Sequence, residues 1–274
     1  MPNNSRLLDS DNFCRQLLSV DELIEYRFYL VTVFGGLCAL VGVFENLWIF
    51  LALLSRRSYR ESHFFYLIFL AFFDVTTASC YVLLFGVHTA AEFLGKWLGD
   101  PKTPRFLALN LLRAWWSFFP HVYGVAQVSL TATGYLIVVA TCERFLLTCN
   151  WSYVKFIKAN RPVLTAAAIG LSFITKVSAF FEFELSKMEN CTGLAEYLPQ
   201  RTELRESRGY HLYSVYIRNV VTVIVPFILL SCLNVAIVLV LRDQQHKQQQ
   251  IITTQLSVST ATFRRVSYLL PLPN

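Results

Sequence analysis

The sequence is poor in charge for its length and lacks the local patterns of most soluble enzymes. Only 15% of its 274 residues are charged and 55% are hydrophobic, a balance that is unusual for a soluble domain of this size. It contains no HExxH, GxSxG or glycine-rich phosphate loop, although many hydrolases and nucleotide-binding enzymes need them. Neither the five histidines nor the seven cysteines have zinc-ligand spacing. We therefore expect no enzyme activity and no metal centre of this kind.

Two further absences narrow the class of partner. Lys and Arg outnumber Asp and Glu by 24 to 18, but they form no basic stripe with interleaved aromatic residues, so nucleic acid is not an expected partner. Excess positive charge also fits a membrane surface. The polar N-terminus has no apolar region of the signal-peptide kind. The first long apolar segment is therefore expected to direct insertion into the lipid bilayer.

Five apolar runs are long enough to cross a membrane as helices. They cover about residues 29–54, 64–87, 117–147, 163–183 and 220–241. About 20 apolar residues suffice for one crossing, and none of the runs alternates as a membrane barrel strand does. The predicted fold class is an all-α membrane protein with five transmembrane helices.

The connections and tails are expected to be polar. We expect loops over residues 88–116 and 184–217, and a glutamine-rich stretch after Arg242 that extends the fifth helix into water for a few turns. Pro271 and Pro273 oppose a helix over the last residues. Residues 1–28 are expected to form an extracellular tail and residues 242–274 a cytoplasmic tail.

The orientation of the bundle is not decided by charge. With the N-terminus outside, eleven Lys and Arg lie inside and twelve outside, so the positive-inside rule favours neither orientation. Two glycosylation sequons, at Asn3 and Asn190, would then face the outside, whereas a third at Asn150 would lie inside and stay unused. The sequons favour an extracellular N-terminus.

Polar residues interrupt the first three runs at matching depths. They are Asn46 in the first run, Asp74 in the second, and Glu143 with Arg144 at the end of the third. A charged side chain at bilayer depth costs roughly 2.5–3.5 kcal/mol on insertion scales, so each needs a polar partner or the interface. Arg144 alone could be an interfacial anchor, and Asp74 alone a structural polar clasp. Together they predict a shared polar core.

This constellation resembles the rhodopsin-like G protein-coupled receptors. The resemblance implies that Asn46 and Asp74 form the polar core, where many family members hold a sodium ion. It implies that Arg144 contacts a G protein and that Glu143 restrains Arg144 in the inactive state. Phe145 stands where the family usually has Tyr. Pro226 resembles the proline of the fifth span, where a missing backbone bond would bend the helix.

A closer resemblance is to the invertebrate FMRFamide-type neuropeptide receptors. It rests on residues 129–135 of the third run, residues 180–185 after the fourth, and the fifth run with Tyr213, Arg218, Asn219 and Pro226. The resemblance implies a plasma-membrane receptor with a peptide ligand and a heterotrimeric G protein, and receptor oligomers remain open.

The sequence also departs from the family. Phe119 stands where many members have a Cys, so Cys191 lacks its usual partner, and a bridge to Cys14 is one alternative. Spans six and seven are absent, so we expect a truncated form that cannot signal alone and could be retained in the endoplasmic reticulum. One alternative is a non-signalling five-span protein that associates with full-length receptors. A small transporter subunit is less favoured, because no internal repeat is present.

Overall fold

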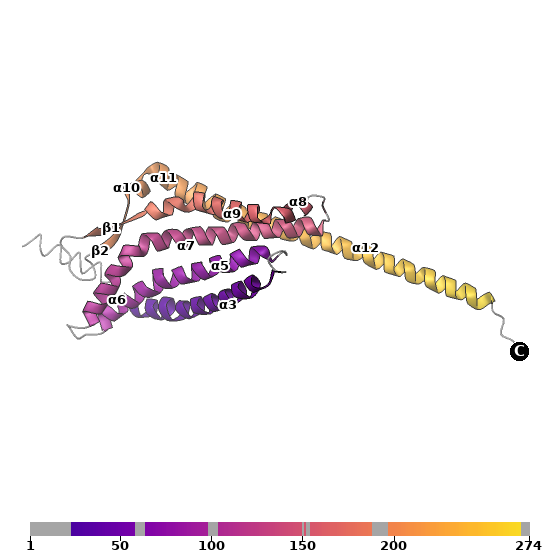
Figure 1. Ribbon diagram of the computed structural model, residues 1–274, viewed down its shortest axis with the longest axis horizontal. Helices are drawn as coiled ribbons and strands as arrows, with labels where there is room; N and C mark the ends of the chain where they lie inside the picture. The colour runs from indigo at the N-terminus through magenta and orange to yellow at the C-terminus, as the bar shows by residue number, and fades with distance from the viewer. Residues whose placement is uncertain are drawn as a thin grey trace, which may run out of the picture.

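A single long helix, α7 (Pro104–Thr148), runs through the centre of the bundle. In this computed structural model, which describes residues 23–57, 64–97, 104–149, 151, 154–187 and 197–269, most other long helices contact α7 (Figure 1). These neighbours are α5 (Phe65–Tyr81), α6 (Val87–Trp97), α9 (Arg161–Lys176) and α12 (Val225–Leu269). α7 is therefore the element through which the two ends of the bundle are connected.

The first span is a continuous helical segment on the outside of the bundle. It consists of α2 (Ile24–Arg27), the π-helical stretch η2 (Phe28–Gly35) and α3 (Gly36–Ser55). α3 packs against α5, and none of its residues is buried. Tyr81 of α5 donates to the carbonyl of Val31 at 3.2 Å, and a Cβ at Gly35 would lie 2.0 Å from the Tyr81 hydroxyl oxygen. Glycine at this position therefore permits the close contact between the two spans.

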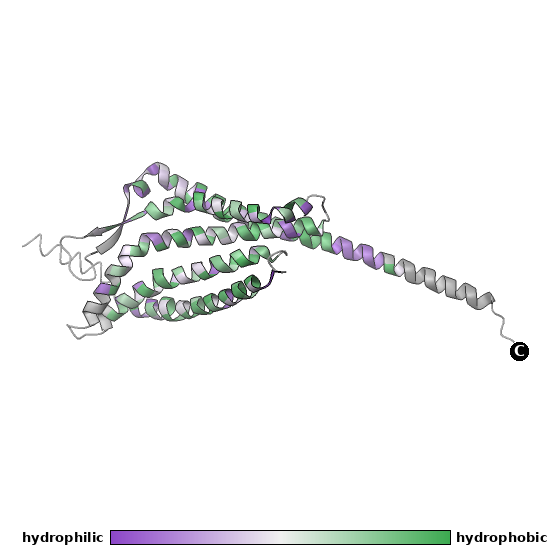
Figure 2. Ribbon diagram, in the orientation of Figure 1, coloured by the Kyte–Doolittle hydropathy of each residue, from purple (hydrophilic) through white to green (hydrophobic). Residues whose placement is uncertain are grey.

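Five helical segments of the described chain are long and apolar enough to cross a membrane. They are Ile24–Ser55, Phe65–Leu94, Ala114–Thr148, Arg161–Phe181 and Arg208–Gln250. All exceed the length of roughly 20 residues that a crossing needs, and Figure 2 shows hydrophobic residues along them. The predicted fold class, an all-α membrane protein, is confirmed, and the chain is a multi-pass membrane protein.

The loop predicted over residues 88–116 was wrong for most of its length. The second span continues through the π-helical η3 (Val82–Gly86) into α6, and α7 already begins at Pro104. Trp115 and Trp116 are buried with Ala91 in a hydrophobic cluster. Aromatic packing between α6 and α7 therefore orders a stretch that looked like a loop.

The connection over residues 184–217 also has regular structure. Strand β1 (Phe183–Lys187) pairs antiparallel with β2 (Tyr197–Arg201), with Phe183 opposite Arg201. The short helices α10 (Glu203–Glu206) and α11 (Arg208–Leu212) follow, and the π-helical η6 (Tyr213–Ile217) leads into the fifth span. The fifth helical segment thus begins at Arg208, before residue 220, where the sequence predicted its start. Its first turns carry polar residues into the bundle.

The fifth span extends far beyond the bundle as the C-terminal part of α12 (Figure 1). The extension was predicted, but it is much longer than a few turns, because α12 ends only at Leu269. No Gly or Pro interrupts the sequence between Phe227 and Leu269, and both would disfavour a helix interior. At the same end of the bundle, the short α8 (Val154–Ala159) connects α7 to α9.

Candidate functional site

Three groups of buried and half-buried polar residues lie along the central helix α7. One group surrounds Glu143 near the end of the bundle that carries α8. A second joins Asp74 to Thr133 in the middle. A third surrounds Glu182 at the opposite end, beside the β-hairpin.

The first group is a buried ion pair between α7 and α9. Glu143 is only 3% exposed, and the Arg161 Nε atom donates to its two carboxylate oxygens at 3.1 and 3.0 Å. The Arg161 Nη2 atom also donates to Oε1 of Glu143. Tyr66 of α5 lies beside the same carboxylate. Paired donors on one carboxylate form a strong, directional contact, so this group fixes three helices at one end.

Arg144 points away from that ion pair. It is exposed and lines a cavity of about 140 Å³ between α5 and α7, together with residues that include Tyr66, Leu70 and Leu136. Among the described residues, its guanidinium forms no ion pair or hydrogen bond. Successive helical residues are separated by about 100° around the axis, so Glu143 faces α9 while Arg144 faces the cavity. Glu143 thus pairs with Arg161 and not with Arg144 in this structure, and a restraint of Arg144 by Glu143 stays a prediction. Phe145 follows half-buried in the same helix.

The predicted polar core of Asn46 and Asp74 is not formed as expected. Asp74 accepts a hydrogen bond from the Thr133 hydroxyl of α7 at 3.1 Å. Asn46 instead donates to the carbonyl of Gly42 in its own helix at 2.9 Å, and in the described part of the chain no hydrogen bond joins Asn46 to Asp74. The amide of Asn46 is therefore paired within its own helix.

Asp74 and Thr133 fit a sodium ion only in part. They supply a carboxylate and a hydroxyl oxygen, which are hard ligands of the kind that such cations prefer. The amide of Asn46 does not complete this set. Sodium binding at Asp74 therefore stays a prediction.

Pro226 lies at the start of α12, directly after a π-helical turn. The turn η7 covers Val220–Ile224, and Thr222 within it donates to the carbonyl of Arg218 at 2.8 Å. A wider turn relieves the clash that a proline ring makes with the preceding turn and leaves its missing donor without consequence. The predicted bend of the helix at Pro226 stays a prediction.

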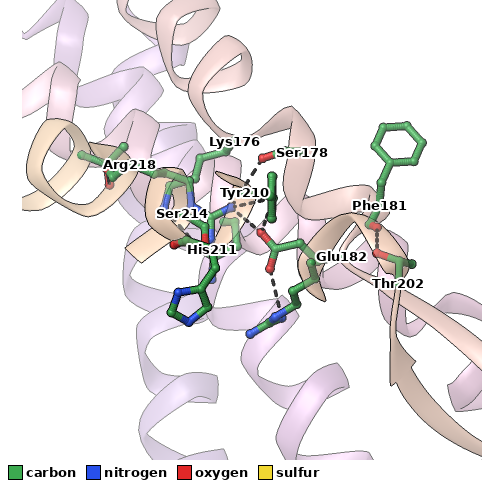
Figure 3. Close-up of polar contacts among 12 residues, drawn as sticks. Lys176, Ser178, Phe181, Glu182, Thr202, Tyr210, His211, Ser214 and Arg218 are labelled. Atoms are coloured by element: carbon green, nitrogen blue, oxygen red, sulfur yellow. Dashed lines mark hydrogen bonds and ion pairs between the residues drawn. The ribbon is translucent and has the colours of Figure 1, made fainter. Parts of the chain in front are cut away.

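The third group surrounds Glu182, which is 1% exposed (Figure 3). Arg205 Nη1 donates to its Oε2 atom at 3.0 Å, and the Tyr210 hydroxyl donates to its Oε1 atom at 2.9 Å. Arg218 Nη1 also donates to Oε1 and lies 3.3 Å from the Tyr210 hydroxyl oxygen. One carboxylate thus receives donors from α10, α11 and the fifth span.

Local contacts hold these elements around Glu182. Glu182 follows the 3-10 turn η4 (Val177–Phe181) at the end of the fourth span and precedes β1. The Thr202 hydroxyl donates to the carbonyl of Phe181 at 2.7 Å, and Ser207 accepts from the backbone N–H of Tyr210 at 3.3 Å as the N-cap of α11. The group therefore ties the hairpin and the start of the fifth span to the fourth.

Lys176, in the fourth span, is directed into the bundle. It is 6% exposed, and its Nζ atom lies 3.3 Å from Oε1 of Gln127 on α7. It also lies within electrostatic reach of Arg218 and Glu182. We call Glu182, Lys176, Arg205, Tyr210 and Arg218 the Glu182 cluster.

Sequence reasoning missed Arg161, Glu182 and Arg205 as site residues. Arg161 lies just before the predicted fourth span, although Pro162 behind it signals the first turn of a helix. Glu182 stood at the end of the predicted fourth span, and Arg205 stood in the segment expected to be a polar loop, where a single charge carries no signal. Arg218 was noted only for its resemblance to the fifth span of peptide receptors.

Several predicted residues lie outside the described part of the chain. These are the glycosylation candidates Asn3 and Asn190 and the proposed bridge between Cys14 and Cys191. The cysteines of the described residues, at 38, 80, 142, 149 and 232, are free.

The class that the structure defines is a multi-pass membrane protein with five apolar helices in its described part and ionic groups toward both ends of its bundle. No protein-family model matches the chain, and no curated protein matches it. Any assignment of function therefore depends on the site residues themselves.

Proposed function

We propose that this protein is a G protein-coupled receptor chain with a neuropeptide ligand of the FMRFamide-like type. The observation that carries the proposal is the pair Glu143 and Arg144 at one end of α7. Arg161 holds Glu143 inside the bundle, and Arg144 is left exposed beside a cavity. An exposed guanidinium at the end of a central helix is suited to bind the carbonyls or the carboxylate of a partner protein.

The opposite end of α7 supports the same proposal. The Glu182 cluster lies there, formed by the end of the fourth span, the hairpin connection and the start of the fifth span. A ligand that moved these elements would act on the same helix that carries Arg144. In this proposal the N-terminus is extracellular, the ligand binds at the Glu182 end and the G protein binds at the α8 end, at the plasma membrane.

Recruitment of a G protein to the purified chain tests this proposal. Labelled G protein heterotrimers would be titrated onto the full chain in lipid nanodiscs, with and without amidated peptides of the FMRFamide type. We expect recruitment that Arg144→Ala weakens about tenfold or more, because a charge-assisted hydrogen bond to a partner is lost. Lys155→Ala, an exposed cation on α8 at the same end, is the matched control and should change it little. Equal loss in both variants, or no recruitment, would contradict the proposal.

A second candidate function is association with another membrane protein, such as a full-length receptor. Glu45 is exposed on the first span, beside Phe44, Trp48 and Ile49, which line a shallow surface cavity of about 410 Å³ with it. A carboxyl group facing lipid is unfavourable unless it meets a polar partner. Glu45→Leu should therefore reduce co-purification with a tagged full-length receptor, whereas Glu25→Leu near the start of this span should not.

A further inference from the structure

The Glu182 cluster holds more positive than negative charge. Lys176, Arg205 and Arg218 surround the single carboxylate of Glu182, so three cations face one anion and the formal balance is +2. In the part of the chain that the structure describes, no other carboxylate forms an ion pair with these cations. Lys176 and Arg218 are shielded from water, where an uncompensated charge is most unfavourable.

Two hydrogen-bond donors of the cluster also lack adequate acceptors. The Nε atom of Arg218 is buried and has no hydrogen-bond partner. The ammonium of Lys176 has three donors, but its one acceptor within the described residues is the neutral amide oxygen of Gln127 at 3.3 Å. Buried donors of native proteins are nearly always paired. The cluster is therefore short of acceptor atoms as well as of negative charge.

An aromatic ring stands beside one of these cations. The guanidinium of Arg205 lies 4.5 Å from the centroid of the Phe183 ring. Phe183 in turn contacts Tyr123 and Phe119 of α7 edge to face, at centroid distances of 5.2 and 5.5 Å. An apolar wall therefore adjoins a region that is rich in positive charge.

We propose that the Glu182 cluster binds the carboxylate of a ligand whose apolar or aromatic body packs near Phe183. Lys176 supplies the opposite charge for that carboxylate, and Arg218 supplies the donor that lacks an acceptor. The view that this carboxylate belongs to a receptor ligand rests on the function proposed above. Binding of the carboxylate itself needs no G protein. The carboxylate could belong to a small aromatic acid or to an acidic peptide side chain.

The test compares matched acids and amides on the full chain. The midpoint of thermal unfolding is measured for the purified protein in nanodiscs at constant ionic strength, because a ligand of the folded state raises it. One arm titrates benzoate against the isosteric benzamide. The other titrates N-acetyl-aspartyl-phenylalaninamide against its asparaginyl analogue. We expect the acid of at least one pair to raise the midpoint at concentrations where its amide does not.

Substitutions then locate the site. Lys176→Gln should weaken acid binding about tenfold or more, as the loss of one buried charge-assisted contact implies. Lys158→Gln makes the same chemical change on an exposed residue of α8 at the other end of the bundle and should leave acid binding unchanged.

The comparison of acid and amide in the unsubstituted protein keeps the inference testable if Lys176→Gln does not fold. Equal shifts with acid and amide in both arms would overturn it, as would unchanged acid binding in Lys176→Gln. A shift in one arm alone assigns the carboxylate to a small acid or to a peptide. Loss of G protein recruitment would leave this measurement unaffected, so the two proposals can fail separately.

Discussion

At the scale of single residues, the buried ion pair of Glu143 and Arg161 is the contact on which one end of the bundle depends most. Both side chains are nearly inaccessible to solvent, so each charge is stabilised chiefly by the other. Removing one partner of such a pair typically costs roughly 3–5 kcal/mol, whereas replacing both with apolar residues is often neutral. The pair therefore need not raise stability, but neither partner can be removed alone.

Glu143→Ala should lower the free energy of unfolding by roughly 3–5 kcal/mol, because it leaves Arg161 buried without an anion. The double variant Glu143→Leu with Arg161→Met should recover most of that loss. Unfolding of the purified chain in detergent, followed by circular dichroism, measures both.

The exposed pair of Asp243 and Lys247 on α12 provides the control for this cycle. Its side chains are 62% and 68% exposed, so Asp243→Ala should change stability by less than about 1 kcal/mol. A small effect of Glu143→Ala, comparable to that of the control, would show that water or lipid headgroups reach Arg161 in solution.

Asp74 allows a second prediction at this scale. If its carboxylate and the Thr133 hydroxyl contribute to a sodium site, sodium should raise the thermal midpoint above the value in potassium at equal ionic strength. Asp74→Asn keeps an acceptor for Thr133 but removes the charge, so it should abolish the difference between the two cations. A midpoint that is identical in sodium and potassium would assign Asp74 to a structural clasp between α5 and α7.

The sequence identified Asp74 but not its partner, and the reason is geometric. The apolar runs around Asn46 and Asp74 predict only how deep each side chain lies in the membrane. The direction of each side chain around its helix axis depends on how the helices pack. Asn46 bonds within its own helix, and Thr133 looked like one of several small hydroxylated residues.

At the scale of elements, Glu182 is the junction between the fourth span, the hairpin and the fifth span. Its two arginine partners come from α10 and from the start of the fifth span, and Tyr210 adds a third contact from α11. The strands and short helices of this connection are too small to be stable by themselves. Their order therefore depends on the carboxylate to which they are attached.

Glu182→Ala should release this connection without unfolding the spans. Hydrogen bonds to a charged group contribute about 1.5–3 kcal/mol each, so local opening should rise by roughly tenfold or more. Limited trypsin digestion followed by mass spectrometry should show faster cleavage after Arg205 and Arg208.

Glu184→Ala is the matched control for this digestion, because Glu184 is exposed on β1 two residues away. It should leave the cleavage rates near those of the unsubstituted chain. Equal cleavage rates in the unsubstituted chain and in Glu182→Ala would mean that the connection does not depend on this carboxylate.

The elements that were predicted correctly differ physically from those that were missed. A membrane helix is specified by one local property, the length of its apolar run, which is why all five spans were found. The hairpin of β1 and β2 and the helix α11 depend on distant contacts such as those of Glu182 with Arg205. α6 looked like a loop because its order comes from packing of Ala91 against Trp115 and Trp116.

At the scale of the whole molecule, the hairpin and α10 lie at the opposite end of the bundle from α8 (Figure 1). The Glu182 cluster lies beside the hairpin, and Arg144 lies near the end of α7 at Thr148. Five crossings put the hairpin at one membrane face, and α8 and the extension of α12 at the other. The proposed ligand and G protein sides follow from an orientation in which the hairpin is extracellular.

Glycosylation mapping decides that orientation. If the N-terminus is extracellular, Asn3 and Asn190 lie on the side where glycans are added and Asn150 does not. In mammalian cells, Asn3→Gln and Asn190→Gln should each remove one glycan from the full chain, and both together should abolish sensitivity to glycosidase. Asn150→Gln serves as the control and should change nothing. A glycan that is lost only in Asn150→Gln would invert the bundle, place Arg144 outside the cell and end the receptor proposal.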